Sequence, residues 1–196
     1  MRRLIAVEFL SLDGVMQGLG SPDEDREGGF EHGGWGAPYA EAIHASRGAD
    51  GLSETTAYLF GRKTYEKMAA FWPHVPDDNP MAAHLNATEK HVVASAPLAF
   101  DWYGTRALTG ELDQEVQALK NTGEGNITIL GSGVLVRSLM QAEMIDALRL
   151  FIHPLVLGSG KRLFGDLPAP QNLTLVDSET TSMGTLVLSY DVVRKP

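Results

Sequence analysis

The feature that most constrains the fold is a direct passage from an apolar strand, Tyr58–Phe60, into a helix that begins in Gly61-Arg62-Lys63-Thr64. A strand-to-helix turn directs free backbone N–H groups and the positive end of the helix dipole at one point, which suits a phosphate. Two adjacent cations stand at this turn, in a chain whose formal net charge is -9. The turn therefore predicts a phosphate pocket, and the alternative is a solvated helix start with two surface charges.

A second strand-to-helix turn is expected at Gly131-Ser132-Gly133, between the β-branched run Asn126–Leu130 and a helix over Val134–Ala142. Glycine lets a backbone approach a pyrophosphate closely. As a dinucleotide fingerprint the turn is incomplete, because Val136 stands at the third glycine position and no acid follows about 20 residues later. The alternative is a compact turn that needs glycine only for its dihedral angles. Two such turns at the carboxyl ends of strands predict a site for the two ends of one dinucleotide.

Strands alternate with helices along the chain and then give way to a terminal pair of strands. This order predicts a single α/β domain, residues 1–196, with a central, mostly parallel mixed sheet flanked by helices and an antiparallel C-terminal hairpin. Besides the elements around the two turns, we expect strands at Leu4–Leu10, His91–Ala94, within Ile145–Val156, Leu173–Val176 and Thr185–Val193, and helices from Pro38 to about Arg47, from Asn79-Pro80 to about Glu89, and from Glu111 to Asn121 with Thr109 as its cap.

Composition excludes several classes of function. The chain has no cysteine, which rules out disulfides, thiolate metal sites and a cysteine nucleophile, and its six histidines lack metal-ligand spacing, so we expect no metal. The acidic balance disfavours nucleic acid as a partner. No apolar run reaches the roughly 20 residues that span a bilayer, so we expect no membrane partner and a cytoplasmic location.

Several polar and aromatic residues are candidates for the chemistry. The long loop Gln17–Gly36 is of a length typical of lids and binding loops. Within it, Trp35 is expected either to stack on a planar substrate or to anchor the loop by packing. Asp13 is a candidate proton relay or a turn residue. Glu41 is a candidate acid on the following helix or part of an exposed polar face. Gly158–Arg162 fails as a P-loop, because Leu155 replaces the first glycine and no hydroxyl residue follows Lys161, so a basic loop is expected there.

Several motifs together carry a family resemblance. Gly61–Glu66, Lys90–Ser95 and Ile129–Gly133 resemble the dihydrofolate-reductase fold. Ser11–Gly14 and Ile145–Gly160 more closely resemble the C-terminal reductase domain of the bifunctional riboflavin-biosynthesis deaminase-reductase, and the best match is to stand-alone bacterial proteins of that superfamily. The resemblance covers nearly the whole chain in the right order.

The resemblance implies an NADPH site. Gly61, Arg62, Lys63 and Thr64 match the turn that meets the adenosine phosphates, including the 2′-phosphate, and Ser95 matches a residue near that phosphate. The turn Gly131, Ser132 and Gly133 matches the one under the pyrophosphate, and Val15, Met16 and Gln17 match the start of the mobile loop beside the nicotinamide. The family is often dimeric, so the resemblance also implies a homodimer.

Departures from the family bear on the substrate. In dihydrofolate reductases, an acidic residue on the helix after the mobile loop supports protonation of the pterin. The corresponding helix of this chain carries Glu41, the candidate for that acid. Where the riboflavin reductase has an Asp-Asp-Pro motif, this chain has Tyr65-Glu66-Lys67. The expected activity is therefore NADPH-dependent hydride transfer to a small heterocycle, either pterin-like or resembling the pyrimidine riboflavin precursor. The alternatives are a nucleotide-binding module without turnover and a dimeric scaffold that uses Ile145–Leu157 as its interface.

Overall fold

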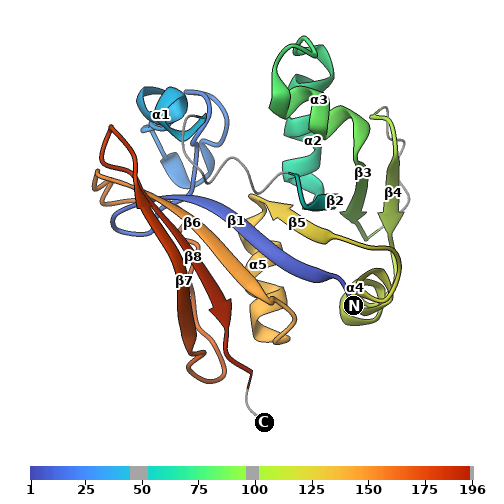
Figure 1. Ribbon diagram of the computed structural model, residues 1–196. Coiled ribbons are helices and arrows are strands. Elements are labelled where there is room, and N and C mark those ends of the chain that lie inside the picture. The colour runs from blue at the N-terminus through green and yellow to red at the C-terminus, as the bar shows by residue number, and fades with distance from the viewer. Residues whose placement is uncertain (45–52, 96–101, 195–196) are drawn as a thin grey trace.

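The computed structural model describes residues 1–44, 53–95 and 102–194. An eight-stranded sheet with the order β4-β3-β2-β5-β1-β6-β8-β7 runs through the molecule (Figure 1). All neighbours from β4 to β6 pair in parallel, whereas β8 pairs antiparallel with β6 and with β7, which confirms the predicted sheet. The strands are β1 (Arg3–Ser11), β2 (Thr55–Gly61), β3 (Glu89–Val93), β4 (Thr105–Leu108), β5 (Asn126–Leu130), β6 (Ala147–His153), β7 (Leu173–Thr180) and β8 (Leu186–Val192).

Helices cover both faces of the sheet. The α-helices are α1 (Ala40–His44), α2 (Arg62–Phe71), α3 (Pro80–Ala87), α4 (Leu112–Lys120) and α5 (Gly133–Gln141). Tyr65 of α2 and Leu85 of α3 pack with Tyr58 and Phe60 of β2 on one face. The buried apolar side chains of α4 and α5 form the larger core on the other face, with Leu4, Ala6 and Leu10 of β1. Among the described residues, no helix is long and apolar enough to cross a membrane.

The helix boundaries follow from local capping. Asn79 caps α3 as predicted, since its Oδ1 accepts hydrogen bonds from the N–H groups of Met81 and Ala82 at 3.0 and 3.2 Å. The prediction that Thr109 caps α4 is wrong. Glu111 is the capping position, without a side-chain cap, and the carboxylate of Glu115 reaches back to the N–H of Gly110 at 3.0 Å, which sets the start of the helix.

Two further expectations change in the structure. The edge strand β4 was missed, because its four residues carry no apolar run and depend on pairing with β3. The segment Ile145–Leu157 is not an edge that could serve as an interface. It contains β6, which is paired on both sides, with β1 and with β8, so it is a central strand. The far part of the first predicted helix, residues 45–47, lies outside the described residues.

The strand order creates one place suited to a ligand. From β2 the chain continues through α2 to β3 on one side, whereas from β5 it continues through α5 to β6 on the other side. Because β2 and β5 are direct neighbours, their following helices leave the shared edge in opposite directions and on opposite faces. In open α/β sheets, a crevice opens at such a point beyond the carboxyl ends of the strands.

Candidate functional site

The two predicted phosphate turns meet in this crevice. The backbone N–H of Gly61 donates a hydrogen bond to Oγ of Ser132 at 3.0 Å, across 71 residues of sequence. A side chain at Gly131 would lie 3.6 Å from the methyl group of Thr64, so the first turn of α2 packs closely over the second turn. The turns therefore form one continuous surface rather than two separate ends of a long site.

Both helix starts at this surface keep their backbone donors free of side-chain caps. Gly61 is the capping position of α2 and Ser132 that of α5, and neither makes a side-chain cap hydrogen bond. The hydroxyl of Ser132 is instead engaged by Gly61. Gly131 and Ser132 both have φ of 69°, and this left-handed pair leads directly into the uncapped first turn of α5. Two uncapped helix N-termini at one point favour binding of an anion.

The loop after β1 lies against the second turn. Val15 is fully buried and forms an isolated antiparallel bridge with Arg162. A Cβ on Gly133 would come within 2.1 Å of Sδ of Met16, so a larger residue at the start of α5 would displace the Met16 side chain. The structure thus brings the predicted nicotinamide-side loop and the predicted pyrophosphate turn together.

Gln17 makes hydrogen bonds that hold together several parts of the long loop. Its Nε2 donates to both the carbonyl and the carboxylate of Asp25 and to the carbonyl of Glu27, at 2.9 to 3.2 Å. Its Oε1 accepts the N–H of Lys161 at 3.0 Å, and its own carbonyl accepts the indole N–H of Trp35 at 2.7 Å. Every polar group of the buried Gln17 amide is thereby used to hold the loop.

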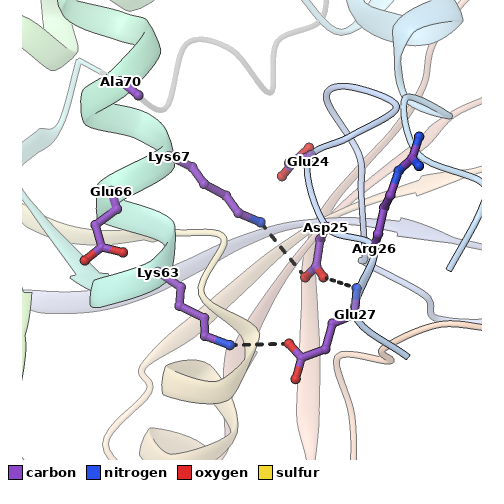
Figure 2. A pocket seen from close by; sticks show the side chains of 8 residues that line it. All are labelled: Glu24, Asp25, Arg26, Glu27, Lys63, Glu66, Lys67 and Ala70. Carbon is purple, nitrogen blue, oxygen red and sulfur yellow. Dashed lines mark hydrogen bonds and ion pairs between the residues drawn. The ribbon is translucent and has the colours of Figure 1, made fainter. Parts of the chain in front are cut away.

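Two acidic residues of that loop stand over the cationic turn. Glu27 contacts Nζ of Lys63 at 3.3 Å, and Asp25 lies 4.0 Å from Nζ of Lys67, one helical turn further along α2 (Figure 2). Nζ of Lys161, from the loop after β6, contacts both carboxylates, at 2.8 Å to Asp25 and 2.7 Å to Glu27. We call Asp25 and Glu27 the acidic clasp.

The remaining predicted cofactor residues lie at the rim. Arg62 is exposed and pairs loosely with Glu66, at 3.8 Å between Nε and Oε1. Ser95 is exposed just beyond β3, the neighbour of β2. The role of Arg62 and Ser95 in cofactor binding stays a prediction.

The candidate acids occupy different surroundings. Asp13 accepts hydrogen bonds from the Ser11 hydroxyl at 2.7 Å and from the N–H groups of Leu157 and Gly158 at 3.1 and 3.0 Å. The Ser11 hydrogen bond and these backbone contacts lower the pKa of Asp13 to about 2, so the group carries no proton at neutral pH. Of the two alternatives for Asp13, a proton relay or a turn residue, these contacts favour the turn residue. Glu41 is exposed on α1.

Aromatic side chains gather beside the crevice, at the carboxyl ends of β1 and β6. His153 is fully buried, with Tyr39 at 4.6 Å, Trp35 at 5.4 Å and Phe9 at 6.3 Å between ring centroids. Its Nδ1 lies 3.0 Å from the hydroxyl of Thr185, and its Nε2 is buried without a partner among the described residues. Burial lowers the pKa of His153 to about 4, so the imidazole is neutral. Trp35, only 8% exposed and bonded through its indole N–H, anchors the loop here.

A buried carboxyl lies where β1 and β5 separate. The β1–β5 register ends at Val7 and Leu130, and Glu8 follows directly, 1% exposed, with one oxygen that has no partner among the described residues. Burial raises the pKa of Glu8 to about 8, against a smaller lowering by Arg137.

Sequence reasoning did not find Asp25, Glu27, Lys67, Lys161 or Glu8 as members of this region. The sequence did indicate a basic loop at Gly158–Arg162 and an acidic composition in the long loop. It could not indicate that the two loops pair, because Lys161 and Asp25 are 136 positions apart. The one sequence signal for a buried carboxyl was the position of Glu8 within the apolar run of β1.

The chain is similar in sequence and fold to several known proteins. The family described as RibD C-terminal domain matches residues 2–187. The uncharacterized protein YyaP of Bacillus subtilis (strain 168) is 27% identical over 144 residues, which is 72% of this chain and 76% of that protein. A Shewanella sp. PV-4 structure with a provisional riboflavin-biosynthesis name has a TM-score of 0.71 and 18% identity, over 98% of this chain and 99% of that one. The dihydrofolate reductase of Enterococcus faecalis, complexed with NADP(H), has a TM-score of 0.54 and 17% identity, over 97% and 96%.

Proposed function

The chain belongs to the RibD C-terminal domain family, and from that premise we propose that it is an NADPH-dependent reductase of a small heterocycle, either pterin-like or resembling the pyrimidine riboflavin precursor. One observation carries the proposal. The contact between Gly61 and Ser132 joins two uncapped helix starts at the carboxyl ends of the neighbouring strands β2 and β5, and in the proposal their backbone N–H groups bind the anionic groups of a dinucleotide. A dihydrofolate reductase of similar fold holds NADP(H), which supports the same cofactor here.

In this proposal each predicted residue has a role in binding. Arg62, Lys63 and Thr64 hold the adenosine phosphates, with Ser95 nearby, and the Gly131–Gly133 turn holds the pyrophosphate. Val15, Met16 and Gln17 flank the nicotinamide. When bound, NADPH supplies the hydride, while the chain binds, orients and excludes water.

The aromatic group beside the crevice supports a planar substrate. Phe9 and Phe151 stack with centroids 4.6 Å apart, and Tyr39 and His153 continue the cluster toward the surface. Phe9 and Tyr39 are partly exposed, and flat faces of this kind favour a small planar ring system. We keep Trp35 as a candidate contact, secondary to its anchoring role.

A homodimer is also part of the proposal. The edge strand β7 exposes Leu173, Leu175 and Val176, and an apolar strand at a sheet edge is a surface on which a second copy can pair. A mass measurement in solution tests this, and a monomer at all accessible concentrations contradicts it.

The test of the enzymatic proposal has two stages. Titration with NADPH is expected to show saturable binding below millimolar concentration. Loss of NADPH absorbance is then measured against pterins, flavins, quinones and pyrimidine precursors.

The ionised state of Asp13 leaves the proton donor unassigned, which favours a second candidate, a nucleotide-binding module without turnover. Binding without oxidation by any acceptor supports that module, and absence of binding contradicts both.

A further inference from the structure

The acidic clasp occupies the place where the proposed function needs an anion. Lys63 and Lys67 lie one turn apart on the same face of α2 (Figure 2). Lys161, from a loop almost 100 residues later in the sequence, contacts the same two carboxylates. Two open surface pockets, of about 510 and 490 Å³, share Glu27 in their linings; Lys63 and Lys67 line the first, and Lys161 lines the second. Three cations thus converge on two carboxylates beside the crevice.

The charges of the clasp resemble those of a phosphate monoester. Two carboxylates carry the charge that a phosphate monoester has at neutral pH, about -1.5 to -2. Hydrogen bonds from Lys161 and Lys63 lower the pKa of Glu27, and those from Lys161, Glu27 N–H and Gln17 outweigh burial to lower the pKa of Asp25. Both groups are therefore ionised at neutral pH. With the clasp in place the three lysines are largely neutralised, and without it they are a strong anion site.

We propose that Lys63, Lys67 and Lys161 form a binding site for a phosphate monoester, and that Asp25 and Glu27 occupy this site until the ligand displaces them. The inference rests on the proposed function, which supplies the 2′-phosphate of NADPH as the competing group. Lys67 and Lys161 are additional cationic residues of the site. Gln17 is a positioning residue, because its amide holds both clasp residues and the Lys161 backbone in one arrangement.

Removing the clasp charges tests the competition. The double variant Asp25→Asn/Glu27→Gln is expected to bind NADPH about three- to tenfold more tightly than the wild type, because exposed ion pairs are individually weak. NADH lacks the 2′-phosphate, so its affinity is expected to change by less than that of NADPH. Isothermal titration measures both dissociation constants.

A matched control variant distinguishes the local effect of the clasp carboxylates from the effect of a change in net charge. Asp23→Asn/Glu31→Gln removes the same two charges from the same loop, but Asp23 pairs with Arg26, Glu31 is exposed, and neither residue lines the two pockets beside the clasp. This control is expected to bind NADPH within twofold of the wild type. If both double variants gain equally, long-range charge explains the effect and the clasp proposal is overturned. Weaker binding by Asp25→Asn/Glu27→Gln overturns it as well, since the carboxylates would then support the ligand.

Hydrogen exchange provides a readout of the clasp itself. Addition of NADPH to the wild type is expected to speed amide exchange in residues 23–29, because the clasp is released. Slower exchange would mean that the segment closes over the cofactor, which overturns displacement while the proposed function stands. If neither the wild type nor either double variant binds NADPH, both proposals fail together. If only the clasp variant binds, the clasp is confirmed as a barrier to the ligand.

Discussion

The N–H of Gly61 and the hydroxyl of Ser132 are 3.0 Å apart, and this hydrogen bond joins the two turns that carry the proposed cofactor site. The hydroxyl of Ser132, the capping residue of α5, accepts this bond and makes no cap hydrogen bond, so the helix start stays open to a ligand. It also holds Ser132 at φ of 69°, a left-handed conformation that costs a non-glycine residue energy. The contact thus combines local strain with an open anion site.

Substitutions at Ser132 separate the bond from the strain. Ser132→Ala is expected to lower the free energy of unfolding by about 1 kcal/mol, because the N–H of Gly61 loses its partner. Ser132→Gly loses the same bond but relieves the left-handed backbone, so it is expected to be about 1 kcal/mol more stable than Ser132→Ala. Denaturant unfolding measures both. Equal stability of the two variants would show that the turn stores no strain.

Arg62 tests the assignment of the 2′-phosphate. Arg62→Ala is expected to weaken NADPH binding about tenfold, the equivalent of one charge-assisted hydrogen bond, and to weaken NADH much less. The exposed Arg106 on β4 provides a control that removes the same charge. Equal losses for the two cofactors would mean that Arg62 does not contact the 2′-phosphate.

Glu8 predicts a pH dependence of stability. Its pKa is 4.5 when exposed and about 8 when folded, so the folded state retains a proton that the unfolded chain releases, and stability falls as pH rises through this window. His153 acts in the opposite direction between its folded value of about 4 and 6.5, where stability is lost as pH falls. The effect of Glu8 is therefore clearest between pH 6.5 and 8.

Glu8→Gln is expected to remove that dependence. The wild type should lose up to about 1.4 kcal/mol of unfolding free energy per pH unit between pH 6.5 and 8, relative to the variant. Urea unfolding at several pH values measures the difference. Parallel pH profiles of the two proteins would show that Glu8 ionises normally in the fold.

The Lys120–Asp146 pair tests a buried interaction far from the crevice. Lys120 is 2% exposed, and its Nζ contacts Oδ2 of Asp146 at 2.6 Å, an oxygen that also accepts the N–H of Leu4 at 2.7 Å. Asp146→Asn is expected to cost about 3 kcal/mol, because it leaves a buried ammonium without its counter-ion. Asp191→Asn removes a pair with Arg3 in which both side chains are half exposed, and is expected to cost under about 1 kcal/mol. Similar losses would contradict the importance of burial.

Local patterns identified most of the fold. The apolar runs of β1, β2 and β5, the Asn79 cap and the C-terminal hairpin depend on neighbours in sequence, so their positions were predictable. The edge strand β4 was missed and the capping residue of α4 was wrong, because each depends on a partner, β3 in one case and the Glu115 carboxylate in the other. The candidate site divides in the same way.

By itself, the sequence determined the two glycine-containing turns and the cations beside the first, because turn geometry and charge are properties of adjacent residues. Tertiary structure decided that β2 and β5 are neighbours, so that Gly61 and Ser132 touch. It also decided that Lys161 meets Asp25, and that Glu8 is buried as β1 leaves β5. Such contacts depend on the order of strands and on desolvation, which no short stretch of sequence specifies.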